Sequence, residues 1–264
     1  MTNLIKDMTI ERHGSEGPSL LWLHGLDGPA PDADVVADLA RFHRVLVPTL
    51  PGFDDVARPE HVDDASDLAL LCLGLLEEEG LESVTLVGHS FGGWIAAEMA
   101  VWRPNRIAQL VLIDALGIRV GGPLDRDIAD MFVIGPEERR NLLFADPANG
   151  GPLPPDLDEE TLLRRMRSEE AAAIYGWEPY LCNPKLRARL ETVTVPSCVI
   201  WGAEDRFVGP AYGRAYADAL PKSSFHLVAD AGHYPHVEQR AEVVDLIRRV
   251  ATSTTGSAAD NASR

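Results

Sequence analysis

Residues 84–94 read VTLVGHSFGGW, a run of β-formers that leads directly into a serine flanked by small residues. A serine on a tight turn between a strand and a helix must adopt a strained backbone conformation, and glycines on either side relieve the crowding. Gly88 and Gly92 stand at these positions. The predicted turn lifts the Ser90 hydroxyl above a sheet, beside the first turn of the next helix. There the backbone N–H of Phe91 can face a negative charge that develops on oxygen.

Strand and helix patterns alternate on both sides of this turn. Nearly continuous apolar runs, typical of strands buried on both faces, occupy residues 20–24, 44–50, 84–89, 110–114, 198–201 and 225–228. Helical patterns lie between most of them, at residues 34–42, 64–79, 92–102, 210–220 and 237–250. The alternation predicts an α/β fold in which a mostly parallel sheet is flanked by helices.

The alternation breaks once, between residues 114 and 195. This segment shows no clear strand pattern. Helical pieces are predicted instead, at residues 125–133, 136–145, 158–175 and 184–190. We interpret the segment as an all-helical insertion that covers the sheet.

A serine hydroxyl is a weak nucleophile at neutral pH and needs a base. His233 follows a predicted strand, and the carboxyl ends of strands are where an α/β sheet gathers its functional side chains. The base in turn needs a carboxylate to orient it. Asp205, in the run WGAEDRFV that follows the preceding strand, supplies one. Asp114 also ends a predicted strand, so it is the alternative acid, although it could instead cap a helix or anchor the insertion.

Five motifs in this order resemble those of the α/β-hydrolase superfamily: LHGLDG at 23–28, LPGF at 50–53, GHSFGG at 88–93, WGAED at 201–205 and GH at 232–233. The resemblance implies that Ser90 is the nucleophile, His233 the base and Asp205 the acid. It also implies that the backbone N–H groups of Leu26 and Phe91 form an oxyanion hole.

The same resemblance implies a domain organisation. It predicts an α/β-hydrolase core of residues 1–114 and 195–250, with an all-helical cap, residues 115–194, inserted after the sixth strand. Residues 251–264 are small and polar, and this composition predicts a disordered tail.

A serine in the strand-to-helix turn resembles the esterase, lipase, lactonase and carbon–carbon hydrolase branches. Haloalkane dehalogenases and epoxide hydrolases carry aspartate there. Hydrolases that cleave carbon–carbon bonds in ring-cleavage products of aromatic degradation typically show a glycine-richer turn after HG, asparagine before the serine and tryptophan after the histidine. This chain has Leu26-Asp27, His89 and Tyr234 at those places.

We therefore favour hydrolysis of a carboxylic ester through an acyl-enzyme. The carbon–carbon hydrolase is the alternative, and a slow-turnover ligand receptor on the same fold is the alternative of another class. A small to medium, partly apolar substrate is expected because the insertion carries apolar and aromatic residues, namely Phe132, Phe144, Tyr175, Trp177 and Tyr180.

The charge and the cysteine content of the chain indicate which classes of binding partner are unexpected. The net charge of −17 argues against nucleic acid and anionic membranes, which select basic patches. No signal peptide or membrane-spanning run is predicted, and Cys72, Cys182 and Cys198 are too widely spaced for a disulfide framework or a zinc site. We expect a cytoplasmic protein that acts on a small molecule with no metal and no organic cofactor; the sequence makes no prediction of oligomeric state.

Overall fold

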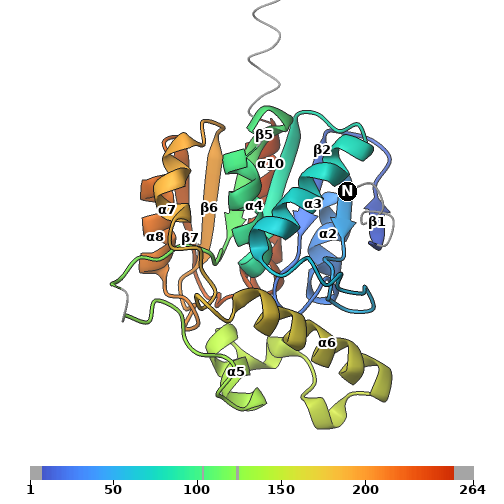
Figure 1. The fold of residues 1–264 in the computed structure, drawn as a ribbon, viewed down its shortest axis with the longest axis vertical. Coiled ribbons are helices and arrows are strands. Elements are labelled where there is room, and N and C mark those ends of the chain that lie inside the picture. The colour runs from blue at the N-terminus through green and yellow to red at the C-terminus, as the bar shows by residue number, and fades with distance from the viewer. Residues whose placement is uncertain (1–7, 103, 123–124, 253–264) are drawn as a thin grey trace, which may run out of the picture.

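The computed structural model describes residues 8–102, 104–122 and 125–252, and its centre is a seven-stranded sheet (Figure 1). In sheet order the strands are β1 (Ile10–His13), β3 (Arg44–Pro48), β2 (Ser19–Leu23), β4 (Val84–His89), β5 (Ile107–Ile113), β6 (Ser197–Gly202) and β7 (Ser223–Val228). β1 pairs antiparallel with β3, and every other neighbouring pair is parallel. The predicted α/β fold with a mostly parallel sheet is confirmed.

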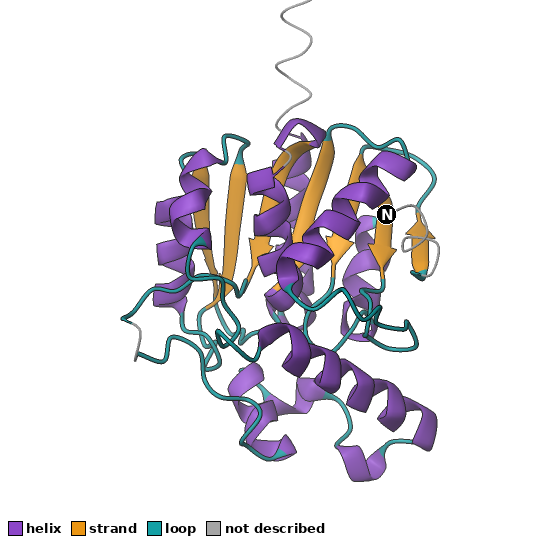
Figure 2. Ribbon diagram, viewed as in Figure 1, coloured by secondary structure: helices purple, strands orange, loops and turns teal. Residues whose placement is uncertain are grey.

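Helices cover both faces of the sheet (Figure 2). One face carries α3 (Ala65–Glu78), α4 (Ser90–Trp102) and α8 (Pro210–Ala219), and the other carries α2 (Ala33–Leu39) and α10 (Arg240–Thr252). Because successive strand residues point to opposite faces, Leu21 and Leu23 of β2 join the first core while Leu20 and Trp22 join the second. Burial on both sides explains why the strands read as unbroken apolar runs.

The chain between β5 and β6 is largely helical, and α5 (Pro136–Leu143) and α6 (Glu159–Gly176) lie across the carboxyl ends of the strands (Figure 1). The segment also holds the 3-10 turns η3 (Pro147–Gly150), η4 (Pro154–Asp156) and η5 (Leu190–Thr192) and the short helix α7 (Leu186–Arg189). α7 packs beside α8 instead of over the strand ends. The resemblance counts the strand before this segment as the sixth; among the described residues it is β5, the fifth. The division into a core and a cap stays a prediction.

One predicted helix of the insertion is wrong, because residues 125–133 form turns without a helix. Backbone N–H groups that this helix would need have other partners. The N–H of Ala129 donates to the carbonyl of Phe207 (2.9 Å), and the N–H of Phe132 donates to Oδ1 of Asp130 (3.2 Å). Aspartate side chains compete with helix formation in this way, and the spacing of apolar residues does not reveal it.

Other boundaries differ in smaller ways. β1, with the sequence IERH, was not predicted because it is a short edge strand with two exposed central residues. The predicted helix 237–250 is two helices, α9 (Pro235–Glu238) and α10, which meet at Gln239. The remaining 3-10 turns are η1 (Ala30–Asp32) and η2 (Pro104–Arg106).

The other structural expectations concern the cysteines, the membrane and the tail. Cys72, Cys182 and Cys198 are buried and free, as expected. In the described part of the chain, no helix is long and apolar enough to span a membrane. Residues 253–264 of the predicted tail lie outside the described residues.

Candidate active site

Ser90 occupies the turn between β4 and α4 with φ +52°, a left-handed conformation that is rare for residues other than glycine. The neighbouring glycines are needed for close packing. A Cβ on Gly88 would lie 2.3 Å from the carbonyl oxygen of Gly92, and a Cβ on Gly92 would lie 2.2 Å from that of Leu23. No side chain fits at either place, so the pattern read from the sequence has a steric origin.

The structure brings Ser90, His233 and Asp205 together from three separate loops. The distance between Ser90 Oγ and His233 Nε2 is 2.8 Å, and that between His233 Nδ1 and Asp205 Oδ2 is 2.7 Å. Ser90 and His233 are each 1% exposed and Asp205 is 4% exposed. A proton could therefore pass from the serine hydroxyl to a ring nitrogen whose partner nitrogen is already held by a carboxylate.

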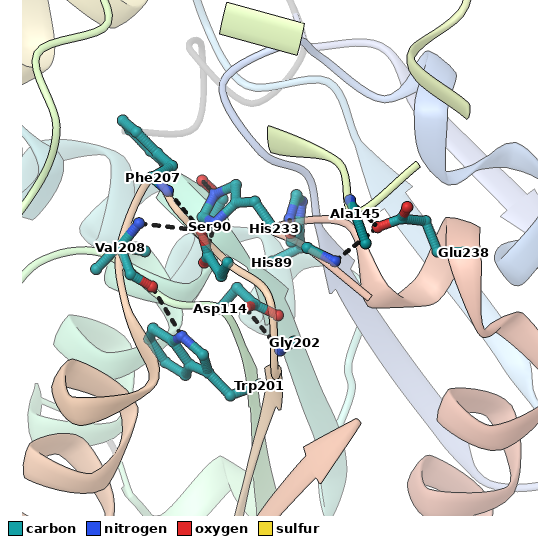
Figure 3. Close-up of polar contacts among 12 residues, drawn as sticks. His89, Ser90, Asp114, Ala145, Trp201, Gly202, Phe207, Val208, His233 and Glu238 are labelled. Atoms are coloured by element: carbon teal, nitrogen blue, oxygen red, sulfur yellow. Dashed lines mark hydrogen bonds and ion pairs between the residues drawn. The ribbon is translucent and has the colours of Figure 1, made fainter. Parts of the chain in front are cut away.

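Asp205 is fixed by its own loop. Its Oδ1 accepts hydrogen bonds from the backbone N–H groups of Phe207 (2.9 Å) and Val208 (3.0 Å), as Figure 3 shows at the left of the site. The neighbouring Glu204 points to solvent and pairs with Arg206 at 3.1 Å. Asp205, and not Glu204, faces the histidine.

The loop that carries His233 is tied to the insertion. Its backbone N–H donates to the carbonyl of Leu143, the last residue of α5, at 2.7 Å. Glu238 accepts from the N–H groups of Gly232 (2.7 Å) and Ala145 (3.2 Å), so one carboxylate binds both the histidine loop and the chain after α5 (Figure 3). Sequence reasoning missed Glu238, which lies five residues beyond His233 and carries no motif of its own.

The predicted oxyanion donors lie in two segments close to Ser90. Phe91 is the second residue of α4, where backbone N–H groups have no partner within the helix. Leu26 follows Gly25, and a Cβ on Gly25 would lie 3.3 Å from Ser90 Cβ. His24 holds this loop, since its Nδ1 donates to the carbonyl of Gly25 (2.8 Å) and its Nε2 accepts from the N–H of Leu50 (3.0 Å). Burial lowers the pKa of His24 and keeps the ring neutral for both bonds. The role of the two N–H groups stays a prediction.

Asp114, the alternative acid, lies below the histidine and does not bond to it. Its Oδ1 accepts from the backbone N–H of Gly202 at 3.0 Å (Figure 3). It caps no described helix, and the predicted role as an anchor of the insertion stays a prediction. The same strand-end position that made Asp114 a candidate does bring it beside Asp205, because β5 and β6 are neighbours in the sheet.

A cavity of about 480 Å³ lies between α5, α6 and the loops that follow β2 and β7. Its wall includes Asp27 and Tyr234, the sequence neighbours of Leu26 and His233, but neither Ser90 nor His233 lines it. Four arginines and two aspartates face this space: Arg139, Arg140, Arg164, Arg165, Asp27 and Asp54. Three of these arginines, Arg139, Arg164 and Arg165, form ion pairs with carboxylates in and beside the wall, so the cavity has no excess of positive charge. Of the five aromatic residues expected to define the substrate pocket, only Phe144 lines it.

A second buried group, missed in the sequence, lies behind the histidine loop. Possible ligand atoms of Asp32, His89 and His236 lie within 4.8 Å of one another, and carboxylate and imidazole groups of this kind can coordinate a metal ion. Each already has a protein partner: His236 Nε2 bonds to Asp32 Oδ1 (2.8 Å), Trp22 donates to Asp32 Oδ2 (2.8 Å), and His89 Nε2 donates to the carbonyl of His233 (2.8 Å). These contacts position the histidine loop, and the expected absence of a metal stays a prediction.

Comparison with known proteins identifies the family. The model of the alpha/beta hydrolase family matches residues 20–246. The chain belongs to the alpha/beta hydrolase family. It is accordingly a hydrolase, and the match spans the five motifs and the segment between β5 and β6.

Individual relatives are distant. The chain is 26% identical to the 2-hydroxymuconate semialdehyde hydrolase of Pseudomonas sp. (strain CF600), over 88% of this chain and 86% of the relative. It is 25% identical to Lipase 3 of Moraxella sp. (strain TA144), over 86% of this chain and 75% of the lipase. Among solved structures, an esterase from Rhodococcus sp. ECU1013 superposes with a TM-score of 0.76 at 24% identity, covering 93% of this chain and 94% of the esterase. At this identity the last likeness supports the fold alone.

Proposed function

We propose that this hydrolase cleaves carboxylic esters through an acyl-enzyme formed on Ser90. The observation that carries the proposal is the pair of short contacts to His233, 2.8 Å from Ser90 Oγ and 2.7 Å from Asp205 Oδ2. A buried serine, a ring nitrogen within proton-transfer distance and a carboxylate on the other ring nitrogen are the parts that nucleophilic acyl transfer needs.

The chemical steps follow from these contacts. The proton of the Ser90 hydroxyl moves to His233 Nε2 as Oγ bonds to the ester carbonyl carbon. The negative charge that forms on the carbonyl oxygen is stabilised by the N–H groups of Leu26 and Phe91. His233 then gives its proton to the leaving alkoxide, which departs as the alcohol. Water repeats the sequence on the acyl-enzyme and releases the acid, while Asp205 stays ionised throughout and holds Nδ1–H.

The substrate proposed is small to medium and partly apolar. The cavity volume of about 480 Å³ falls in the range of small-molecule sites. Apolar side chains of the insertion, Leu143, Phe144, Leu153 and Leu157, line it. The likeness to Lipase 3 supports an ester substrate. We expect the enzyme to act in the cytoplasm, without a cofactor and without a nucleic-acid or membrane partner.

A second candidate is hydrolysis of a carbon–carbon bond in a ring-cleavage product. One observation favours it, the likeness to the 2-hydroxymuconate semialdehyde hydrolase. The residues Asp27 and Tyr234 depart from the pattern typical of that branch. A slow-turnover receptor would use the same serine but would turn over only slowly.

A panel of substrates separates these functions. Initial rates are measured with p-nitrophenyl esters of graded acyl length, with a p-nitrophenyl ester whose acyl chain ends in a carboxylate, and with a dienol ring-cleavage product. The proposal predicts multiple turnovers on the esters, lost in Ser90→Ala and retained in Ser197→Ala, a serine whose hydroxyl bonds only to the carbonyl of Val195 within the described residues. Turnover of the dienol alone would favour the second candidate. A burst of one equivalent followed by only slow turnover would favour the receptor.

A further inference from the structure

Two carboxyl groups meet beneath the histidine of the proposed active site. Asp114 follows β5 and Asp205 follows β6, and these strands run parallel side by side. One oxygen of each carboxyl group and one ring nitrogen of His233 all lie within 4.8 Å of one another. Asp114 is fully buried and Asp205 is 4% exposed, so neither charge is screened by water.

The hydrogen bonds of the two groups are unequal. Asp205 accepts three, from Phe207 N–H, Val208 N–H and His233 Nδ1–H. Asp114 accepts one, from Gly202 N–H to Oδ1. The other oxygen of Asp114, Oδ2, is buried and meets no N–H or O–H donor within the described residues.

A buried carboxylate oxygen without a donor, next to a second carboxylate, is unstable as an anion, because desolvation and like charge both disfavour ionisation. A single proton bound to the pair removes one of the two negative charges and supplies the missing hydrogen-bond donor. If Asp114 carries it, the acid becomes a donor, and the neighbouring carboxylate of Asp205 is the acceptor. Burial first, and then the charge of Asp205, raise the pKa of Asp114 well above its usual range. Asp205 already accepts three hydrogen bonds while Asp114 accepts one, so the proton belongs on Asp114.

We propose that Asp114 is a positioning residue: as a neutral carboxylic acid it donates a hydrogen bond to Asp205, and so holds the Asp205 carboxylate toward His233 Nδ1. The inference rests on the proposed function, in which Asp205 orients the base. Asp114 exchanges no proton during the reaction. The titratable groups that face it are Asp205 after β6, His233 after β7 and, with a smaller effect, Glu238 on α9.

The backbone conformation at Asp114 decides which replacement is best matched. Asp114 has φ +43°, a conformation in which aspartate and asparagine are the most tolerated residues other than glycine. Asparagine is therefore the matched replacement. Its amide oxygen can accept from Gly202 N–H and its amide N–H can donate to Asp205, as the protonated acid does, with no charge at any pH.

The first test compares Asp114→Asn with Asp114→Ala by kcat, KM and the pH dependence of kcat/KM on a p-nitrophenyl ester. Alanine removes the donor, so we expect kcat to fall by at least about tenfold with KM nearly unchanged. Asparagine should rescue most of this loss and leave the midpoint of the acidic limb where the wild type has it. An ionised Asp114 would behave differently: its loss in Asp114→Asn would lower that midpoint by about one unit. Such a shift, or full activity in Asp114→Ala, would overturn the inference.

A second measurement does not depend on activity or on the alanine variant folding. The infrared carbonyl band of a protonated carboxyl group should be present in the wild type at about pH 8, where ordinary aspartates are ionised. It should disappear in Asp114→Asn. Absence of the band in the wild type, or its persistence in Asp114→Asn, rejects the neutral Asp114. If no ester is hydrolysed but the band behaves as expected, the proposed function is wrong, while the hydrogen bond from a neutral Asp114 to Asp205 is still supported.

Discussion

The hydroxyl of Tyr234 donates a hydrogen bond of 2.5 Å to Oδ2 of Asp27. Both residues depart from the sequence pattern of the carbon–carbon hydrolases, and in the structure they are in direct contact. The bond joins the residue after His233 to the residue after Leu26. Arg139 of α5 reaches the other oxygen of Asp27 at 2.6 Å and Glu169 of α6 at 2.8 Å. The histidine loop, the loop of the proposed oxyanion hole and the insertion therefore meet at one carboxylate.

Removal of Arg139 should destabilise the protein. Arg139→Met leaves Asp27 without its cation, and the guanidinium and carboxylate side chains are only 9% and 24% exposed. Breaking a fully buried pair costs 3–5 kcal/mol; with partial exposure we expect about 2–3 kcal/mol in the free energy of unfolding, measured in urea. The control Arg164→Met breaks pairs whose arginine is 44% exposed and should cost clearly less, because water screens exposed ion pairs. An equal loss of unfolding free energy in the two variants would show that the Arg139–Asp27 pair stabilises the protein no more than an exposed ion pair does.

The acid should be Asp205 and not Asp114. Asp205→Asn keeps the shape but no longer holds the ring of His233 in the required tautomer, and the comparable change in a serine protease lowers kcat by about 10⁴. Asp114→Asn should lower kcat by less than about tenfold, because Asp114 makes no hydrogen bond to the ring. Measured side by side on one ester, the reverse order would assign the acid to the strand before the insertion.

Stability should fall as the pH falls below about 6.5. Burial lowers the pKa of His24, His89 and His236, the last to about 3. Each ring is neutral when folded but binds a proton when unfolded below pH ~6.5, so the unfolded state binds more protons and unfolding becomes easier. Each group adds up to ~1.4 kcal/mol per pH unit to the slope. The raised pKa values of Asp32 and Asp114 act in the opposite direction and reduce the sum.

Urea unfolding between about pH 4 and 7 measures this slope. His236→Gln should lower it by up to ~1.4 kcal/mol per pH unit, whatever it does to the stability at neutral pH. His61→Gln, at an exposed position, should leave the slope unchanged. An unchanged slope in His236→Gln would mean that this ring is protonated in the folded state.

The insertion should control substrate size. Leu157→Trp fills part of the cavity, so kcat/KM for long acyl esters should fall by at least about tenfold while that for an acetate ester stays within about twofold. Leu163→Trp adds the same bulk on α6 at a position that is 47% exposed and outside the cavity wall. If both variants leave the chain-length profile unchanged, the cavity is not where the acyl chain binds.

Much of this architecture could be predicted, because local rules decide it. The turn at Ser90 is dictated by contacts of Gly88 and Gly92 with nearby backbone, and strands buried on both faces leave an apolar pattern in the sequence. The contacts among Asp27, Tyr234 and Arg139 could not be predicted, since they join residues up to 207 positions apart. The same holds for the pairing of Asp114 with Asp205, because the sequence presented the two aspartates as rival candidates for the acid and not as partners.

The central claim is that Ser90 forms the acyl-enzyme, and active-site labelling tests it most directly. A fluorophosphonate probe is reacted with the wild type, Ser90→Ala and Ser197→Ala, and the modified peptide is identified by mass spectrometry. We predict one equivalent of label on Ser90 in the wild type and in Ser197→Ala, and none in Ser90→Ala. Labelling of Ser90→Ala at the rate of the wild type would contradict the account.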